Sequence, residues 1–255
     1  MKKAILQRPN DYEAHIQYIS ALMAENKLSA AETASKRAIK KFPDIIQISV
    51  LRAEILAKME RFYPARHLLQ KLILRKPDLA VAYVMLGLID CEQHLDQDAI
   101  SKFETAMEID PKNYQASFFA ASLYLKMLDY GNAERALKQT LTAHPGHIEA
   151  LKSIGELMVK TNRYEEAVGF LRQILAHSNI DVESAAYLIQ AEVIAKNSKI
   201  GVVTAKKLIA IFPESIEVLE AHIFALIRDG QFEKAIKQCD QLINCHIPAG
   251  SMAVF

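Results

Sequence analysis

The stretch from residue 80 to residue 113, AVAYVMLGLIDCEQHLDQDAISKFETAMEIDPKN, decides the fold of this chain, because its landmarks recur every 34 residues. The stretch carries a proline near its end, Pro111, and prolines at the same interval on either side are Pro9, Pro43, Pro77 and Pro145. Pro213 lies two further intervals on, with Asn179 in the intermediate slot. A fixed period of this length is typical of proteins that stack one structural unit upon another.

Small residues follow the same period. With each of these prolines at position 32, the units are 12–45, 46–79, 80–113, 114–147, 148–181, 182–215 and 216–249. Position 20 is small in every unit, although nothing in the choice of proline required it, and reads Ala31, Ala65, Ala99, Ala133, Ala167, Gly201 and Ala235. We therefore expect a tandem array, rather than the one or two compact domains that the length of 255 residues suggests.

Each unit is expected to form two helices, the first over positions 1 to about 14 and the second over about 18 to 31. The proline ends the second helix and directs the chain into the next unit. Small residues at positions 8 and 20 lie where the helices cross, because large side chains there would hold the axes apart. Such units cannot bury a hydrophobic face alone, so neighbours stack into an all-α solenoid.

This pattern resembles the tetratricopeptide repeat. The Leu-Gly, Ala, Phe, Ala and Pro positions of that family are occupied in the unit 80–113 by Leu86-Gly87, Ala99, Phe103, Ala106 and Pro111. The resemblance covers about the whole chain and implies a right-handed α-solenoid of seven repeats. Residues 1–11 are then expected to be the end of a second helix of a partial repeat, and residues 250–255 a C-terminal tail.

The ends of the array leave alternatives open. No polar capping helix follows the last unit, although the ends of solenoids normally need one for solubility. The chain is therefore an excised piece of a longer protein, which we favour, or its end is buried by self-association, or its tail folds back on the last helix.

The composition bears on which classes of partner the chain can bind. The chain has 31 lysines and arginines against 30 aspartates and glutamates, which provides no overall field to attract nucleic acid or an anionic membrane, so we expect neither. The N-terminal apolar run is too short for a secretory signal, and no run approaches a membrane span. We therefore expect a cytoplasmic chain. Its three cysteines do not make a disulfide framework.

The family resemblance implies that positions 2, 5, 6, 9, 12 and 13 of the first helices line a concave groove. In the second to fourth units these positions are mostly apolar, and the predicted groove residues are Leu51, Val84, Met85, Leu88, Phe118, Phe119 and Ser122. In later units they are mixed and lean acidic, and the predicted groove residues are Lys152, Glu156, Tyr187 and Gln190. Such a surface suits an apolar or amphipathic segment of another protein with a basic flank.

Packing between helices is the alternative role for these apolar side chains. We favour packing for Val50, Val81 and Leu125, because a helix that is apolar on several sides is usually buried. We favour ligand contact for Met85, Leu88, Phe118 and Phe119. The two adjacent phenylalanines cannot both face one seam of a helix, and exposed aromatic patches usually mark interaction sites.

Two known binding modes of the family are not expected. The clamp for terminal carboxylates needs a set of Lys, Asn and Arg in three consecutive repeats, and its closest start, Lys152, is followed by Glu156. The ladder that holds peptide backbones needs Asn at position 6, which reads Gln17, Leu51, Met85, Phe119, Ser153, Tyr187 and Ala221. The remaining mode is recognition of a partner through its apolar side chains. This mode resembles the way in which tetratricopeptide chaperones of secretion systems bind their cargo.

No catalytic residue, cofactor or metal site is predicted. His144 and His147 lack a third ligand, and the remaining candidate group has neither a redox nor a zinc spacing: Cys239, Cys245 and His246. No glycine-rich phosphate loop or nucleophile motif occurs. Polar residues stand where the family is usually apolar at Asp90, Glu192 and His222. We interpret these three as local register adjustments or paired polar contacts.

The leading hypothesis is a non-catalytic scaffold or chaperone-like adaptor that binds a partner protein in its groove. Two alternatives belong to other classes. One is a self-assembling structural protein whose uncapped ends stack, and the other is the interaction domain of a larger enzyme or regulator.

Overall fold

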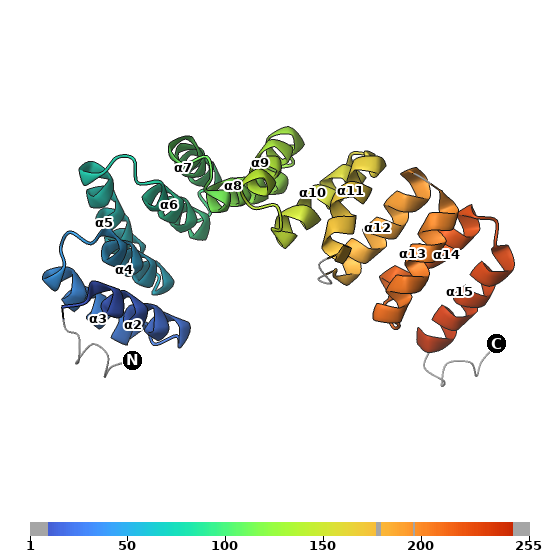
Figure 1. Ribbon diagram of the computed structural model, residues 1–255, viewed down its shortest axis with the longest axis horizontal. Helices are drawn as coiled ribbons and strands as arrows, with labels where there is room; N and C mark the ends of the chain where they lie inside the picture. Colours follow the sequence, from blue (N-terminus) through green and yellow to red (C-terminus); the bar gives the residue numbers. More distant parts are fainter. Residues whose placement is uncertain (1–9, 177–179, 196, 247–255) are drawn as a thin grey trace. The chain divides into compact units, whose positions relative to one another are not determined.

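A computed structural model describes residues 10–176, 180–195 and 197–246, and every regular element in these ranges is an α-helix (Figure 1). By their internal contacts the residues form two compact units, 1–143 and 144–255. Most of the expected partial repeat at 1–11, and the whole expected tail at 250–255, lie outside the described residues.

The first unit is a series of helix pairs in which each helix packs on the next. Its helices are α2 (Tyr12–Ala24), α3 (Leu28–Lys41), α4 (Ile46–Lys58), α5 (Phe62–Arg75), α6 (Ala80–Glu92), α7 (Asp96–Ile109), α8 (Tyr114–Lys126) and α9 (Tyr130–Ala143). In addition, α4 contacts both α2 and α6, so the first helices of neighbouring pairs lie side by side.

The second unit has the same construction. Its helices are α10 (Ile148–Lys160), α11 (Tyr164–Ala176), α12 (Val182–Ala195), α13 (Ser198–Ile211), α14 (Ile216–Arg228) and α15 (Phe232–His246). The first helices α10, α12 and α14 again contact one another in sequence. The predicted all-α solenoid class is therefore confirmed. Each helix pair lies inside one 34-residue interval, and we retain these intervals as the proposed repeat frame.

A residue in the left-handed conformation turns the chain between the two helices of a pair. The residues with positive φ are Asn26, Glu60, His94, Leu128, Asn162 and Gly230, all at position 15. The N–H of the following residue donates to a carbonyl near the end of the first helix, as from Arg61 to Leu56 at 2.8 Å. This is a Schellman cap, which satisfies helix carbonyls while reversing the chain.

Close approach of the helices explains the small residues at position 8. A Cβ added at Gly155 of α10 would lie 2.6 Å from Cδ2 of Leu171 on α11. A Cβ at Gly87 would lie 2.6 Å from the ring of Phe103. Both facing side chains are fully buried and have no room to move aside. The predicted role of small residues at the crossings is thus confirmed at these two sites.

Two buried acids join successive helix pairs through arginines. Asp90 of α6 accepts a hydrogen bond from Arg66 of α5 at 2.6 Å, and Glu192 of α12 is paired with Arg172 of α11 at 2.5 Å. Each acid is 1% exposed, so the pairing offsets the desolvation of its charge. These contacts confirm the interpretation of both residues as paired polar contacts.

His222 of α14 is a buried imidazole, only 6% exposed. Burial lowers its pKa, and the nearby Lys206 lowers it further, although the neighbouring Gln238 acts in the opposite direction. The imidazole is therefore neutral in the folded chain at pH 7.

We predict that Gly155→Ala destabilises the second unit by about 1–3 kcal/mol, because the added methyl group overpacks the crossing with Leu171. The matched control is Gly169→Ala on α11, where an added Cβ would meet no atom within 4 Å. That change should stabilise the helix by about 0.5–1 kcal/mol. Urea unfolding of both variants measures the difference, and equal effects would contradict the packing argument.

We predict that the second unit loses stability as the pH falls below about 6.5, the ordinary pKa of histidine. The unfolded chain protonates His222 in that range, while the folded chain resists protonation, so acid favours unfolding. His222→Leu should remove this part of the decline, whereas His67→Gln at an exposed position of α5 should keep it. Unfolding free energies at pH 7.5 and 5.5, about one unit on either side of the ordinary value, provide the test. The same decline in the His222 variant would rule out this origin.

Candidate functional site

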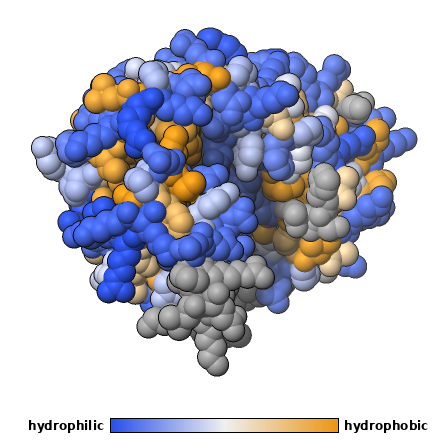
Figure 2. Space-filling view, turned by 60° about the vertical axis from the view of Figure 1, so that its left-hand side comes forward, coloured by the Kyte–Doolittle hydropathy of each residue, from blue (hydrophilic) through white to orange (hydrophobic). Residues whose placement is uncertain are grey.

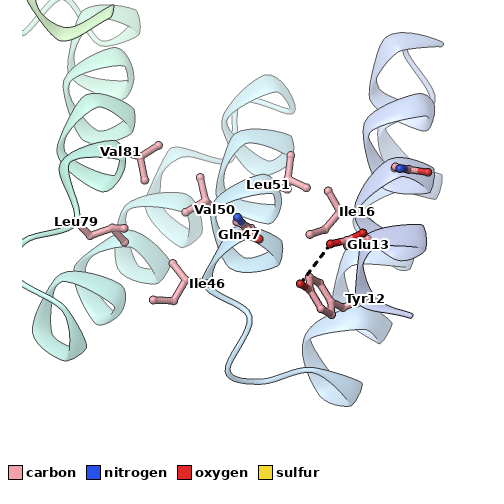
Figure 3. Close-up of a pocket in the computed structure, with 10 residues that line it drawn as sticks. Tyr12, Glu13, Ile16, Ile46, Gln47, Val50, Leu51, Leu79 and Val81 are labelled. Carbon is pink, nitrogen blue, oxygen red and sulfur yellow. Dashed lines mark hydrogen bonds between the residues drawn. The ribbon is translucent and has the colours of Figure 1, made fainter. Parts of the chain in front are cut away.

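A groove of about 710 Å³ opens on the first unit where α4 lies between α2 and α6. Figure 3 shows side chains from the three helices around a shared space. The lining residues are Tyr12, Glu13, Ile16 and Gln17 of α2, Ile46, Gln47, Val50 and Leu51 of α4, and Leu79 and Val81 at the start of α6. Most of them occupy positions 2, 5 and 6 of their proposed repeats.

The chemistry of this groove is that of a binding surface. Its lining is mainly aliphatic, and the one ionised side chain among the lining residues is Glu13, whose carboxylate accepts a hydrogen bond from the Tyr12 hydroxyl at 3.4 Å. No pair of titratable groups faces the space in a way that would move a proton. The groove offers instead several apolar contacts that a large side chain could fill.

A second hollow of about 420 Å³ lies between α4, the start of α5, and α6. Its apolar floor includes Phe62, Met85 and Leu88. Its rim carries three carboxylates against the single cation of Lys58, and these acids are Glu54, Glu60 and Glu92. Lys58 lies 4.0 Å from Glu54, so the rim as a whole remains negative and favours a basic group near an apolar anchor.

The two hollows share one face of α4. Val50 and Leu51 line the first hollow, and Glu54 and Lys58 line the second. Residues four apart lie one turn above another on a helix, so these side chains form a continuous stripe. Along this stripe of α4, the apolar surface of the first hollow therefore continues into the acidic rim of the second hollow.

Some of the predicted groove residues of the first unit line the two hollows, and one is buried in the core. Leu51, Met85 and Leu88 line the two hollows. Val84 is a correction, because it is 4% exposed and packs in the core cluster of Phe103, so it presents no surface to a ligand. For Val50 and Val81 we expected packing between helices. Both instead line the groove, and Val81 is 37% exposed.

The residues predicted on α8 lie outside both hollows. The Phe119 ring is 5.6 Å from that of Phe103 and belongs to the core of this unit, which limits its contact with a ligand. Phe118 is half-buried, with its ring 6.2 Å from Phe119, and the exposed Ser122 donates a hydrogen bond to the carbonyl of Phe118. Leu125 is half-buried.

The predicted residues of the second unit form a polar cluster on α10 and α12, which contact each other. Lys152 lies 2.9 Å from Asp181 and 2.8 Å from Glu183, and these hydrogen bonds raise its pKa. Burial raises the pKa of Tyr187, and the neighbouring carboxylates of Glu156 and Glu183 add to the effect. Gln190 is half-buried. Because Lys152 is engaged by two acids, it is poorly suited to grip a carboxylate ligand.

Sequence reasoning missed the contribution of α2. Positions 2, 5 and 6 of the unit 12–45 are Glu13, Ile16 and Gln17, so the repeat positions that indicate the groove in later units also indicate it here. Ile46 and Leu79 carry no such signal, because they stand at repeat positions 1 and 34, outside the groove positions of the family.

Neither a metal site nor a membrane-spanning helix occurs among the described residues. The described residues hold no group of three or more histidines, cysteines or acids that could bind a metal ion. His147 caps α10, where its Nδ1 accepts a hydrogen bond from the N–H of Ala150 at 3.2 Å. In the described part of the chain, no helix has the length and apolar character needed to cross a bilayer.

Several solved structures have a similar fold. The structure titled "Functional Characterization of Pseudomonas Aeruginosa pilF" has a TM-score of 0.66 at 15% identity, covering 82% of this chain and 95% of that chain. YrrB, described as a TPR protein with an unusual peptide-binding site, has a TM-score of 0.63 at 17% identity, covering 70% and 92%. PilW, described as a type IV pilus biogenesis factor, has a TM-score of 0.60 at 20% identity, covering 81% and 96%. At these identities the likeness concerns the fold.

The comparison with family models agrees with the helical repeat. No curated protein matches the chain by sequence. The model of the tetratricopeptide repeat matches residues 128–191, which include the turn residue Leu128 and the tight crossing at Gly155. Within this segment the chain resembles the tetratricopeptide repeat, and regular helix pairs continue on both sides of it.

Proposed function

We propose that this chain is a non-catalytic interaction module that binds an apolar or amphipathic segment of another protein. The observation that carries the proposal is the stripe on α4, along which an apolar groove passes into a hollow with an acidic rim. The tetratricopeptide family consists of protein–protein interaction scaffolds, and one protein of similar fold is described as having a peptide-binding site.

The two hollows suggest what the bound segment looks like. Large apolar side chains would fill the groove between Ile16, Val50 and Val81, where burial of apolar area contributes about 25 cal/mol per Å². A lysine or arginine next to these anchors would face Glu54 and Glu92 at the second hollow. Such a ligand matches the role of a chaperone-like adaptor, which holds an apolar segment of its client.

We predict that a displayed library of random peptides, selected on this chain, becomes enriched in sequences with large apolar anchors and a basic flank. Val50→Ser with Val81→Ser should weaken binding of the selected peptides at least about tenfold, because the apolar contacts of the groove are lost. Fluorescence anisotropy measures the affinity. The matched control is Ile200→Ser with Val203→Ser on α13, two apolar residues that are 38% and 55% exposed.

A second variant of this chain tests the role of the basic flank of the peptide in the same binding experiment. Glu54→Gln with Glu92→Gln should reduce the preference for basic over neutral flanks and lower the salt dependence of binding. Selected peptides that bind the Val50 and Val81 variant as tightly as the parent chain would contradict the proposed site.

Self-assembly is a second candidate, favoured by an apolar stripe on α15. Phe232, Ile236 and Ile243 of that helix are 60%, 62% and 49% exposed. At the repeat position of Ile236, the preceding helix pairs of this unit have Val168 and Val202, which are 1% and 4% exposed because the next pair covers them. Ile236 has the same apolar character, no further helix pair of the described residues packs on it, and a second copy could supply such a contact.

Sedimentation velocity tests this second candidate. If copies associate through α15, the chain should form dimers or larger species at micromolar concentration, and Ile236→Ser should return it to a monomer. Ile211→Ser, at a position of α13 that is 55% exposed, is the control and should leave association unchanged. A parent chain that is monomeric throughout would exclude self-assembly under these conditions.

A further inference from the structure

The second helices α3 and α5 of the first unit form a surface separate from the groove. Two ion pairs connect them along their length. Arg61, next to the start of α5, lies 2.7 Å from Glu32 of α3, and Arg75 at the end of α5 lies 3.3 Å from Asp44 just beyond α3. The helices therefore lie side by side, and we call their exposed residues the basic surface.

The exposed charged residues within α3 and α5 are all basic, although the exposed Asp44 and Asp78 follow these helices. The exposed lysines and arginines are Lys36, Arg37, Lys40 and Lys41 of α3, and Lys71, Arg75 and Lys76 in and just after α5. No exposed residue within α3 or α5 is acidic. The neighbouring second helix α7 is different, since its exposed residues include Asp98, Glu104 and Glu108. The near-zero net charge thus hides a strongly basic patch, and the argument from net charge does not apply to it.

Apolar side chains project from the same surface. Leu74 is 83% exposed and Tyr63 is 81% exposed, the highest values among the exposed large hydrophobic residues in the described ranges. Both belong to α5, and their separation of eleven residues, about three helical turns, places them on one side of it. Tyr63 stacks on His67, with ring planes 8° apart and centroids separated by 6.5 Å. Figure 2 shows how apolar residues reach the surface among hydrophilic ones.

A shallow hollow on α3 adds a third feature. Its volume is about 300 Å³, and the described residues that line it are Glu32, Thr33, Lys36, Arg37 and Lys40. Glu32 is engaged by Arg61, so the three cations dominate the hollow. A phosphate group with its negative oxygens fits this arrangement of donors.

We propose that the basic surface docks this protein on the headgroups of an anionic lipid bilayer. Lysines and arginines are attracted to such a surface, and exposed leucine and tyrosine side chains enter the interface between headgroups and acyl chains. Nucleic acid would engage the cations but leaves the exposed Leu74 without a role. The docking uses second helices, whereas the groove lies on first helices, so the proposal goes beyond the proposed function and does not depend on it.

Vesicle co-sedimentation at physiological ionic strength tests the docking. The full chain should bind phosphatidylcholine vesicles that contain roughly one third phosphatidylglycerol, and should not bind pure phosphatidylcholine. Lys36→Gln, Arg37→Gln and Lys40→Gln together should weaken binding about 100-fold, since each basic residue near the surface contributes about fivefold. The matched control is the same change of three exposed lysines on α13, namely Lys199→Gln, Lys206→Gln and Lys207→Gln.

A second variant distinguishes a bilayer from nucleic acid. Leu74→Ser should weaken binding to the anionic vesicles by roughly threefold and leave binding to an oligonucleotide duplex unchanged. Absence of binding to anionic vesicles, or equal binding by the triple variant and its control, would overturn the proposal. Binding to the duplex without binding to vesicles would also overturn it and assign the surface to nucleic acid. Circular dichroism shows whether each variant keeps its helical fold.

Discussion

The close contact between the two helices of a pair is the constraint on which the structure depends. Where Gly155 faces Leu171, or Gly87 faces Phe103, there is no space for even one additional carbon atom. At these two crossings the contact sets the distance between the helices of a pair, and a left-handed residue after the first helix reverses the chain. Successive pairs of the first unit repeat this reversal, and α2, α4 and α6 lie next to one another and create a groove.

The fold could be predicted from sequence because its determinants are local and recur with one period. Prolines such as Pro77 and Pro111 mark the ends of second helices, and glycine or alanine marks the crossings. The conformation of Leu128 could not be predicted in this way. A leucine rarely adopts a positive φ, and here the cap between α8 and α9 imposes it.

The candidate site was only partly predictable. Repeat positions indicated Leu51, Met85 and Leu88, and each of them lines one of the two hollows, while their contact with a partner stays a prediction. They were wrong for Val84, which is covered by neighbouring helices, and they did not indicate that Phe119 packs against Phe103. Burial depends on the size of side chains on adjacent helices, which a pattern within one repeat does not specify. Net charge does not reveal the basic surface for a similar reason, because it gives a sum without a location.

The proposed interaction role depends on the groove formed by the first helices. The most direct test therefore follows the groove side chains while a peptide binds. Methyl NMR spectra of the chain, recorded as a selected apolar peptide with a basic flank is added, report on each isoleucine and valine. We expect the methyl signals of Ile16, Val50 and Val81 to shift together, while Ile200 and Val203 stay unchanged. Shifts confined to α13, with none in the groove, would contradict the proposed site.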